Sequence, residues 1–316
     1  MSTSRPLLSV IIPNWNGAAL LPSCLDALRE QTLRDFEVIL VDNASRDESC
    51  ALVRERYPEV RLLEMPRNLG LTGGCNAGIG VARGELIALL NNDAEADPRW
   101  LEALAGALAR HPEAGSAATK MLLHDRRDVI NSAGDFYGRD GIPGNRGVWQ
   151  PDDGSYDQEM WVFGACGGAV AYRRAMLDEI GLFDEDFFMY CEDVDLAWRA
   201  QLAGWRCIYA PQARVYHRLS ATGGGALSSY YTGRNTLYVI AKDMPASIRQ
   251  KHWRRIAAAQ WRVARDALRA WRGEAARARL RGQWAGIIGW RQAREKQARG
   301  QGLRRVSDEY LESILS

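Results

Sequence analysis

Several patterns that define familiar protein classes are missing from this sequence. No apolar run approaches the ~18–20 residues needed to cross a bilayer, and residues 1–6 show no charged-then-apolar leader. The six cysteines are scattered without a Cys-x-x-Cys pair, which argues against a zinc ribbon or a disulfide framework. Scattered thiols are typical of a reducing compartment, so we expect a cytoplasmic protein.

Two common nucleotide-binding fingerprints are missing as well. A dinucleotide-binding turn needs three glycines in a G-x-G-x-x-G pattern after the first strand. Here the corresponding turn reads PNWNG over residues 13–17 and contains one glycine, and no P-loop pattern occurs anywhere. A Rossmann oxidoreductase is therefore only the third choice of functional class, and absence of NAD binding would dispose of it.

The sequence does have an ordinary globular composition with an uneven charge. Its 316 residues are 47% hydrophobic and 25% charged, enough for one large domain or two smaller ones. The net charge is only +2, yet residues 249–305 hold 17 of the 41 basic and 3 of the 39 acidic residues. An acidic body thus carries a basic region, which points to an anionic partner surface.

The order of predicted elements indicates an α/β fold with a mainly parallel sheet, because apolar runs alternate with amphipathic stretches through the first 120 residues. We predict strands at 7–12 (stopped by Pro13), 36–41, 60–64 and 86–90, and helices at 18–30, from 47, after a Gly73-Gly74 turn, and from 97 to 111. Residues 124–158 are predicted as loops or a small insertion. Later predictions are a strand at 163–172, a helix at 192–203, a strand at 206–209, a flexible segment at 220–225 and helices from 227 onward.

Polar residues gather where four consecutive predicted strands end. They are Asn14 and Asn16 after the first strand, Asp42 and Asn43 after the second, Arg67 and Asn68 after the third, and Asn91, Asn92 and Asp93 after the fourth. The carboxyl ends of parallel strands line the ligand crevice of an open sheet, so we interpret this set as a binding site. Taken alone, Asp42 would suit a turn or a helix cap equally well.

Several segments together resemble family 2 glycosyltransferases of the rhamnosyltransferase-like subgroup. They are VIIPNWN at 10–16, VDNASRD at 41–47, RNLG at 67–70, GGCN at 73–76, LNND at 90–93 and CEDVDL at 191–196. The resemblance covers about residues 7–245 in the family's order and spacing. It implies a Rossmann-like GT-A fold, a nucleotide-sugar donor, a divalent metal and inversion at the anomeric carbon.

The resemblance also assigns a donor site. Asp42 is expected to accept a hydrogen bond from N3–H of a pyrimidine base. The other expected donor-binding residues are Pro13, Asn14 and Asn16 at the base and ribose, Arg67 and Asn68 near the ribose or diphosphate, Gly73 and Gly74 against the sugar-phosphate, Asn92, and Arg234 near the phosphates. Residues 220–225 (SATGGG) would serve as a lid over the diphosphate.

For the metal, the resemblance points to Asp93 and His217. Asp93 ends the LNND motif, whose first position is Asn91, so the motif supplies one carboxylate. His217 is the expected second ligand of Mn²⁺ or Mg²⁺, and phosphate oxygens and water would complete the shell. The ordinary alternatives are a helix cap for Asp93 and a structural role for the histidine.

Glu192 and Asp193 form the strongest pair of neighbouring acids in the chain. Acids in the first turn of a helix are also ordinary caps and dipole partners. The resemblance makes Asp193 the base that takes the proton of the acceptor hydroxyl, with Glu192 orienting or binding the acceptor.

The basic region projects as an amphipathic helix. At about 100° per residue, an arc of Trp, Ile, Val, Leu and Ala opposes an arc of Arg and Lys between residues 251 and 272, and Trp and Ile recur to residue 290. The apolar arc could pack on the catalytic domain or on a second subunit, or it could attach to an anionic membrane surface through residues 251–290. No nucleic-acid recognition motif is visible, so we do not expect that partner.

Together these features predict a glycosyltransferase domain at residues 1–245 and a basic helical extension at 246–316. We expect an inverting, metal-dependent transfer of L-rhamnose from dTDP-rhamnose to a saccharide or lipid-linked saccharide acceptor. The enzyme would act in cell-surface polysaccharide synthesis, at the inner face of the plasma membrane. UDP-linked hexose, hexosamine or galactofuranose donors stay open, as does a non-catalytic scaffold that binds nucleotide sugars at a membrane.

Overall fold

The fold is built on a mixed sheet whose order explains where the crevice lies. The computed structural model describes residues 5–219 and 224–316. Within these residues the main sheet has the strand order β10-β12-β6-β11-β4-β1-β2-β3, and β5 pairs with β12 and β7 with β6 outside this order. The strands are β1 (Leu8–Asn14), β2 (Phe36–Asp42), β3 (Arg61–Glu64), β4 (Leu86–Leu90), β5 (Ala94–Ala96), β6 (Ala114–Leu123), β7 (Ile130–Ala133), β10 (Met160–Val162), β11 (Ala169–Arg173) and β12 (Arg206–His217). β1 to β4 run parallel, whereas β11 runs antiparallel between β4 and β6.

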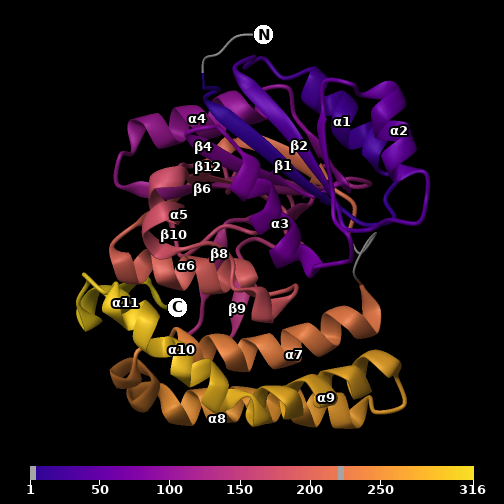
Figure 1. The fold of residues 1–316 in the computed structure, drawn as a ribbon. Helices are drawn as coiled ribbons and strands as arrows, with labels where there is room; N and C mark the ends of the chain where they lie inside the picture. The colour runs from indigo at the N-terminus through magenta and orange to yellow at the C-terminus, as the bar shows by residue number, and fades with distance from the viewer. Residues whose placement is uncertain (1–4, 220–223) are drawn as a thin grey trace.

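Helices cover both faces of this sheet, as the predicted βαβ units require (Figure 1). They are α1 (Leu21–Arg29), α2 (Ser49–Arg56), α3 (Gly70–Val81), α4 (Trp100–Arg110), α5 (Arg174–Ile180) and α6 (Glu192–Ala203). Side chains alternate along a strand, so Val10 and Ile12 pack in the cluster with α1 and α4, while Ile11 packs in the cluster with α3, α5 and α6. The predicted α/β fold class is confirmed.

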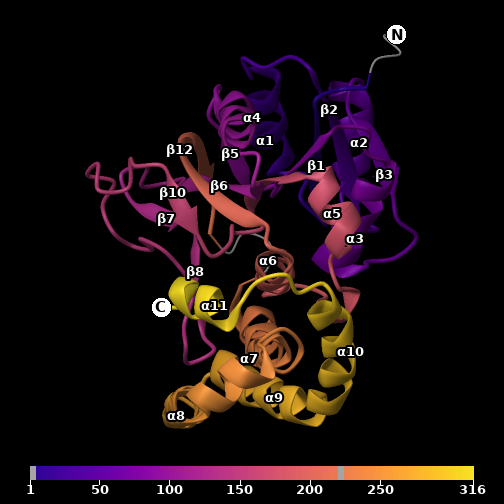
Figure 2. The ribbon, with the colours of Figure 1, turned by 90° about the vertical axis from the view of Figure 1, so that its left-hand side faces the viewer.

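The C-terminal helices form a separate layer below the sheet (Figures 1 and 2). They are α7 (Gly225–Lys242), α8 (Ala246–Arg269), α9 (Glu274–Ile288), α10 (Trp290–Gly302) and α11 (Asp308–Ile314). One hydrophobic cluster joins Trp198 of α6 to Ile240, Ile248 and Leu311 of these helices. No helix among the described residues is both long and apolar enough to cross a bilayer.

The far C-terminal segment is tied to a small hairpin. Strands β8 (Asp135–Tyr137) and β9 (Pro143–Asn145) form a two-stranded sheet of their own. The Ser316 amide donates to the carbonyl of Tyr137 at 3.1 Å, and the Arg139 amide donates to the carbonyl of Ser316 at 2.9 Å. Residues 308–316 therefore support the hairpin from below.

Several sequence predictions differ from the observed elements, and three of them concern the site. β1 continues through Pro13, because beyond Ile11 the strand pairs with β2 alone and Pro13 needs no donor on its other side. Gly73 and Gly74 lie within α3, and the left-handed turn that opens this helix is at Gly70, with φ +73°. Residues 124–158 hold β7, β8 and β9, which are only three or four residues long and therefore too short for an alternating pattern to show in the sequence.

Candidate active site

A cavity of about 590 Å³ opens at the carboxyl ends of β1 and β4, between them and the N-terminal turns of α6 and α7. Eight of the fourteen predicted site residues line it: Pro13, Asn14, Asn68, Asn92, Asp93, Glu192, Asp193 and His217. The other six are Asn16, Asp42, Arg67, Gly73, Gly74 and Arg234, which do not line the cavity. Residues 220–223 of the predicted lid lie outside the described residues.

A chain of side-chain hydrogen bonds crosses the ends of three strands. Asn92 Nδ2 donates to Asn14 Oδ1 at 2.7 Å, and Asn14 Nδ2 donates to Asp42 Oδ1 at 3.1 Å. Asp42 Oδ2 accepts the Ser45 amide at 2.9 Å. Asp42 is thus buried behind Asn14, and Asn14 presents this chain to the cavity.

The single glycine of the first turn makes that chain geometrically feasible. A Cβ placed on Gly17 would lie 2.3 Å from both Asn14 Oδ1 and Asn92 Nδ2, closer than any real contact. Only glycine therefore leaves room for the two asparagines to meet. Gly74 plays a similar part behind the wall, since its Cβ would lie 2.7 Å from Asn43 Nδ2, which donates to the Gly70 carbonyl.

The remaining predicted donor residues lie at the edge of the site. Asn16 accepts the Arg46 amide at 2.8 Å and holds the first two strand-end loops together. Arg67 is exposed beside Asn68. A Cβ on Gly73 would lie 2.6 Å from the Cβ of Leu69, so this glycine serves the start of α3.

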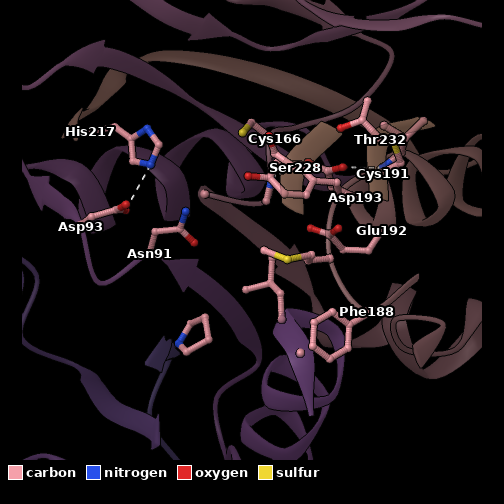
Figure 3. A pocket seen from close by; sticks show the side chains of 18 of the residues that line it. Asn91, Asp93, Cys166, Phe188, Cys191, Glu192, Asp193, His217, Ser228 and Thr232 are labelled. Carbon is pink, nitrogen blue, oxygen red and sulfur yellow. Dashed lines mark hydrogen bonds and ion pairs between the residues drawn. The ribbon is translucent and has the colours of Figure 1, made fainter. Parts of the chain in front are cut away.

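Asp93 and His217 meet on one side of the cavity (Figure 3). Asp93 Oδ1 lies 3.1 Å from His217 Nε2, and both side chains are largely buried. His217 Nδ1 lies 3.0 Å from Asn131 Oδ1, and the tautomer that donates there leaves the Nε2 lone pair for a ligand. Two ligands at right angles in an octahedral shell of 2.0–2.1 Å radius lie about 3 Å apart, so the separation fits a divalent cation.

No group of three or more His, Cys, Asp or Glu side chains is arranged around a metal position within residues 5–219 and 224–316. The Asp93–His217 pair is therefore a two-ligand candidate. A divalent cation held by two protein ligands would take its other ligands from phosphate oxygens and water.

Glu192 and Asp193 occupy the opposite side of the cavity, at the first turn of α6 (Figure 3). Asp193 Oδ2 accepts the Gly167 amide at 2.9 Å, and Oδ1 accepts the Val194 amide at 2.8 Å. Burial raises the pKa of Asp193, although these two N–H groups oppose the rise. Burial and then the Asp193 charge raise the pKa of Glu192 well above its usual value, and Glu192 Oε2 has no hydrogen-bond partner in the described part of the chain.

The loop before this acid pair holds three non-glycine residues in the left-handed region: Phe188, Tyr190 and Cys191, with φ of 63–65°. Such backbone costs free energy and persists only where the surroundings enforce it. The fully buried Asn235 of α7 enforces it here, because its Nδ2 lies 2.7–3.0 Å from the carbonyls of Phe187, Met189 and Tyr190.

Arg234 supports the same loop from α7. Its guanidinium donates to the carbonyls of Asp186 and Phe187, the latter at 3.2 Å. It also lies over the rings of Tyr231 and Tyr238. The structure therefore places Arg234 against the loop rather than in the cavity wall.

A buried ion network fixes α6 from behind. Asp195 pairs with Arg199 at 2.8 Å and with Lys242 of α7. Although burial acts to raise its pKa, the Arg199 and Lys242 cations lower the pKa of Asp195 below its usual value. Lys242 also pairs with Asp184 at 2.7 Å, and Lys296 of α10 reaches the same carboxylate at 2.7 Å.

Asp135, a buried acid in the cavity wall, was not predicted from the sequence. Asp135 of β8 accepts Asn145 Nδ2 at 2.7 Å and Ser132 Oγ at 3.3 Å. Burial, with the Asp193 charge, raises its pKa to about 8. The segment is rich in Gly, Asp and Arg and weakly periodic, and the long-range bridge between Asp135 and Gly164 helps to place the carboxyl at the cavity.

The fold and this site indicate an enzyme that binds a nucleotide-linked substrate, and comparison with known proteins identifies its family. The sequence profile described as "Glycosyl transferase family 2" matches residues 9–181. The chain belongs to this family of glycosyltransferases, and the predicted resemblance is confirmed.

One related sequence and two related structures show which glycosyltransferases this chain is similar to. The N-acetylglucosaminyl-diphospho-decaprenol L-rhamnosyltransferase of Mycobacterium tuberculosis is 30% identical over a 263-residue alignment that covers 75% of this chain and 84% of the relative. The mannosyltransferase PcManGT from Pyrobaculum calidifontis, solved with GDP-Man and Mn²⁺, has a TM-score of 0.56 at 22% identity and covers 95% of this chain and 86% of that one. GalNAc-T7, solved with UDP, GalNAc and Mn²⁺, has a TM-score of 0.60 at 16% identity, over 79% of this chain and 55% of that chain. These structural likenesses confirm the GT-A fold.

Proposed function

We propose that this glycosyltransferase is metal-dependent and inverting, and that it transfers L-rhamnose from dTDP-rhamnose to a lipid-linked saccharide in cell-surface polysaccharide synthesis. One observation carries the proposal: a single cavity has the Asp93–His217 pair on one side and the Glu192–Asp193 pair on the other (Figure 3). A donor diphosphate against the first pair would present its sugar carbon to an acceptor hydroxyl held at the second.

Asp193 is the base in this proposal. It accepts the proton of the acceptor hydroxyl while that oxygen bonds to the anomeric carbon and the bond to the diphosphate breaks, which inverts the carbon. Two backbone N–H groups favour the ionised form of Asp193 over that of its neighbour. Burial and the Asp193 charge raise the pKa of Glu192, and in this proposal Glu192 binds the acceptor through its carboxyl, whose Oε2 is buried without a hydrogen-bond partner among the described residues.

Asp93 and His217 would hold Mn²⁺ or Mg²⁺, and the bound cation would stabilise the negative charge on the departing diphosphate. The base and ribose would lie against Pro13, Asn14 and Asn16, with Asp42 acting through Asn14. Arg67, Asn68, Asn92, Gly73 and Gly74 would complete the donor side, with Arg234 holding the loop above it. UDP-linked hexose, hexosamine or galactofuranose donors fit the same residues.

The sugar and acceptor are proposed from the relatives, since the Mycobacterium tuberculosis protein is named as an L-rhamnosyltransferase acting on a lipid-linked N-acetylglucosamine. We place residues 1–245 as the transferase domain and residues 246–316 as a helical extension that lies on the inner face of the plasma membrane. A scaffold that only binds nucleotide sugars would need no base, so Asp193 separates the two functions.

The test begins with thermal unfolding of the full chain with dTDP, UDP and GDP, each with and without Mn²⁺. We expect stabilisation by dTDP that requires the metal. Transfer is then followed by mass spectrometry with dTDP-rhamnose and a short-chain prenyl diphosphate-linked N-acetylglucosamine, with Asp193→Asn as the control. Metal-dependent nucleotide binding without any transfer from dTDP- or UDP-sugars would overturn the proposal in favour of the scaffold.

A further inference from the structure

The apolar arc predicted for residues 251–272 is divided in two by the structure. One stripe of α8 is buried against α9, α11 and the α6–α7 cluster: Ile248, His252, Ile256, Ala259 and Ala267. The intervals along this stripe are those of one helix face. Packing on the protein therefore accounts for only part of the apolar surface that the sequence displays.

The rest of the apolar residues form a second stripe that faces solvent. It consists of Trp253, Ala257, Trp261, Ala264, Leu268 and Trp271, spaced by three or four residues and confined to an arc of about 80°. The three tryptophans are 58–66% exposed and Leu268 is 52% exposed. We call these residues, with the exposed Trp284, Ile287 and Ile288 of α9, the tryptophan face.

The two helices that carry the tryptophan face lie side by side at the end of the molecule farthest from the sheet (Figures 1 and 2). Exposed large apolar side chains scattered singly need no explanation, whereas a group on two adjacent helices marks an interaction surface.

Basic residues border this face. On α8, Arg254, Arg262, Arg265, Arg269 and Arg272 occupy the sector next to the tryptophan stripe, about 100–180° from Trp253. Arg269 has 71% of its side chain exposed and forms an ion pair with Asp266 at 3.8 Å. Long cationic side chains of this kind keep their charge in the headgroup layer while their stems cover apolar surface.

We propose that the tryptophan face docks on an anionic lipid bilayer. Trp and Ile favour the boundary between headgroups and acyl chains, and the bordering arginines attract anionic headgroups. A second copy of this chain fits less well, because its matching face would present the same excess of basic residues, 17 against 3 acidic over residues 249–305, and few partners for the arginines. Nucleic acid would use the arginines and leave the exposed apolar area uncovered.

Docking would also fix the orientation of the cavity, an inference that rests on the proposed lipid-linked acceptor. α7 lies between the tryptophan face and the cavity, which it lines with Leu227, Ser228 and Thr232. α7 and α9 touch through their backbones, since a Cβ on Gly282 would lie 2.1 Å from the Tyr230 carbonyl oxygen. The membrane surface and the cavity wall are thus two sides of one rigid layer.

The experiment is flotation of the full chain with vesicles of phosphatidylcholine alone or with one quarter phosphatidylglycerol. We expect binding that needs the anionic lipid, and a partition coefficient at least about tenfold lower in the double variant Trp261→Ala/Trp271→Ala. Trp149→Ala is the matched control, because Trp149 is 58% exposed on a loop outside α8 and α9. Thermal unfolding of each variant checks that the fold is kept.

Equal binding to neutral and anionic vesicles, no binding of the full chain, or unchanged binding of the double variant would overturn the proposal. So would a concentration-dependent dimer in sedimentation that the double variant abolishes, because the face would then serve self-association. Transfer to a short, water-soluble acceptor should be unchanged in the double variant. If the full chain floats but transfers no sugar, the proposed function fails while the docking face stands.

Discussion

His217 Nε2 and Asp93 Oδ1 lie 3.1 Å apart and tie the end of β12 to the turn after β4. The adjoining backbone holds them in register, since His217 pairs with Ala94 of β5. Asn131 orients the imidazole from the other side. The pair is therefore fixed by three strands before any ligand arrives.

Removing the imidazole should abolish the metal-dependent part of donor binding. In His217→Ala we expect the added thermal stabilisation by dTDP with Mn²⁺ to disappear, and transfer to fall by at least about 100-fold. Asn131→Ala, which keeps both ligands but loses the orienting contact, should lose only about 10-fold. An unchanged Mn²⁺ effect in His217→Ala would remove this residue from the metal site.

Neutralising the two cavity acids should have unequal effects. Asp193→Asn removes the proton acceptor, so we expect kcat to fall by about 10²–10⁴-fold with little change in donor KM. Glu192→Gln should cost much less, because burial and the Asp193 charge raise the pKa of Glu192 well above its usual value and so disfavour its ionised form. Steady-state kinetics of both variants measures this, and the reverse order would assign the base to Glu192.

Removing the side-chain amide of Asn235 should lower kcat as well as the free energy of unfolding. Asn235→Ala removes the amide that donates to three loop carbonyls, so we expect a loss of about 1–3 kcal/mol in the free energy of unfolding and a lower kcat, as the acid pair loses its orientation. Gln283→Ala is the matched control, since its amide donates to the Gln260 carbonyl of α8 and Gln283 does not line the cavity. Equal kcat in the two variants would show that Asn235 is only structural.

Asp135 should make the protein less stable as the pH rises. Its pKa is about 8 in the folded chain and about 3.9 in an unfolded chain. Between these values the unfolded chain has released the proton that the folded chain still holds, so the free energy of unfolding falls by up to ~1.4 kcal/mol per pH unit and levels off above pH 8. Asp135→Asn should flatten this slope and raise stability at pH 8, as urea unfolding at pH 6, 7 and 8 would show. A slope that is unchanged in this variant would contradict the assignment, and the exposed Asp153→Asn serves as control.

The features that could be predicted from the sequence are those whose signal lies in neighbouring residues. Helix α6 matches its predicted bounds of 192–203 because acidic first-turn residues and a following Gly204 mark both ends within the sequence itself. The strand-end asparagines could be found because parallel strands place their carboxyl ends together. Asp135 could not, since its position depends on a bridge to Gly164 almost thirty residues away.

The helical extension shows a second limit. Periodicity identifies the apolar side of α8, but it does not tell which apolar residues on that side are buried. Ile256 is buried, whereas Trp261 is 66% exposed. The division depends on where α9 and α11 lie, which is a property of the assembled chain. Arg234 is a similar case, because its motif marks it as functional but only packing shows that it holds a loop.

The contacts between residues 308–316 and the β8–β9 hairpin bear on the order in which the chain folds during synthesis. The parallel strands β1 to β4 and the helices α1 to α3 between them lie in the N-terminal third of the chain and can pair as soon as they emerge. The hairpin that carries Asp135 gains its contacts with Leu311 and Ser316 only after α8 to α10 have been made. In a nascent chain the β1–β4 side of the cavity can therefore assemble first, and the wall that Asp135 lines receives its C-terminal support later.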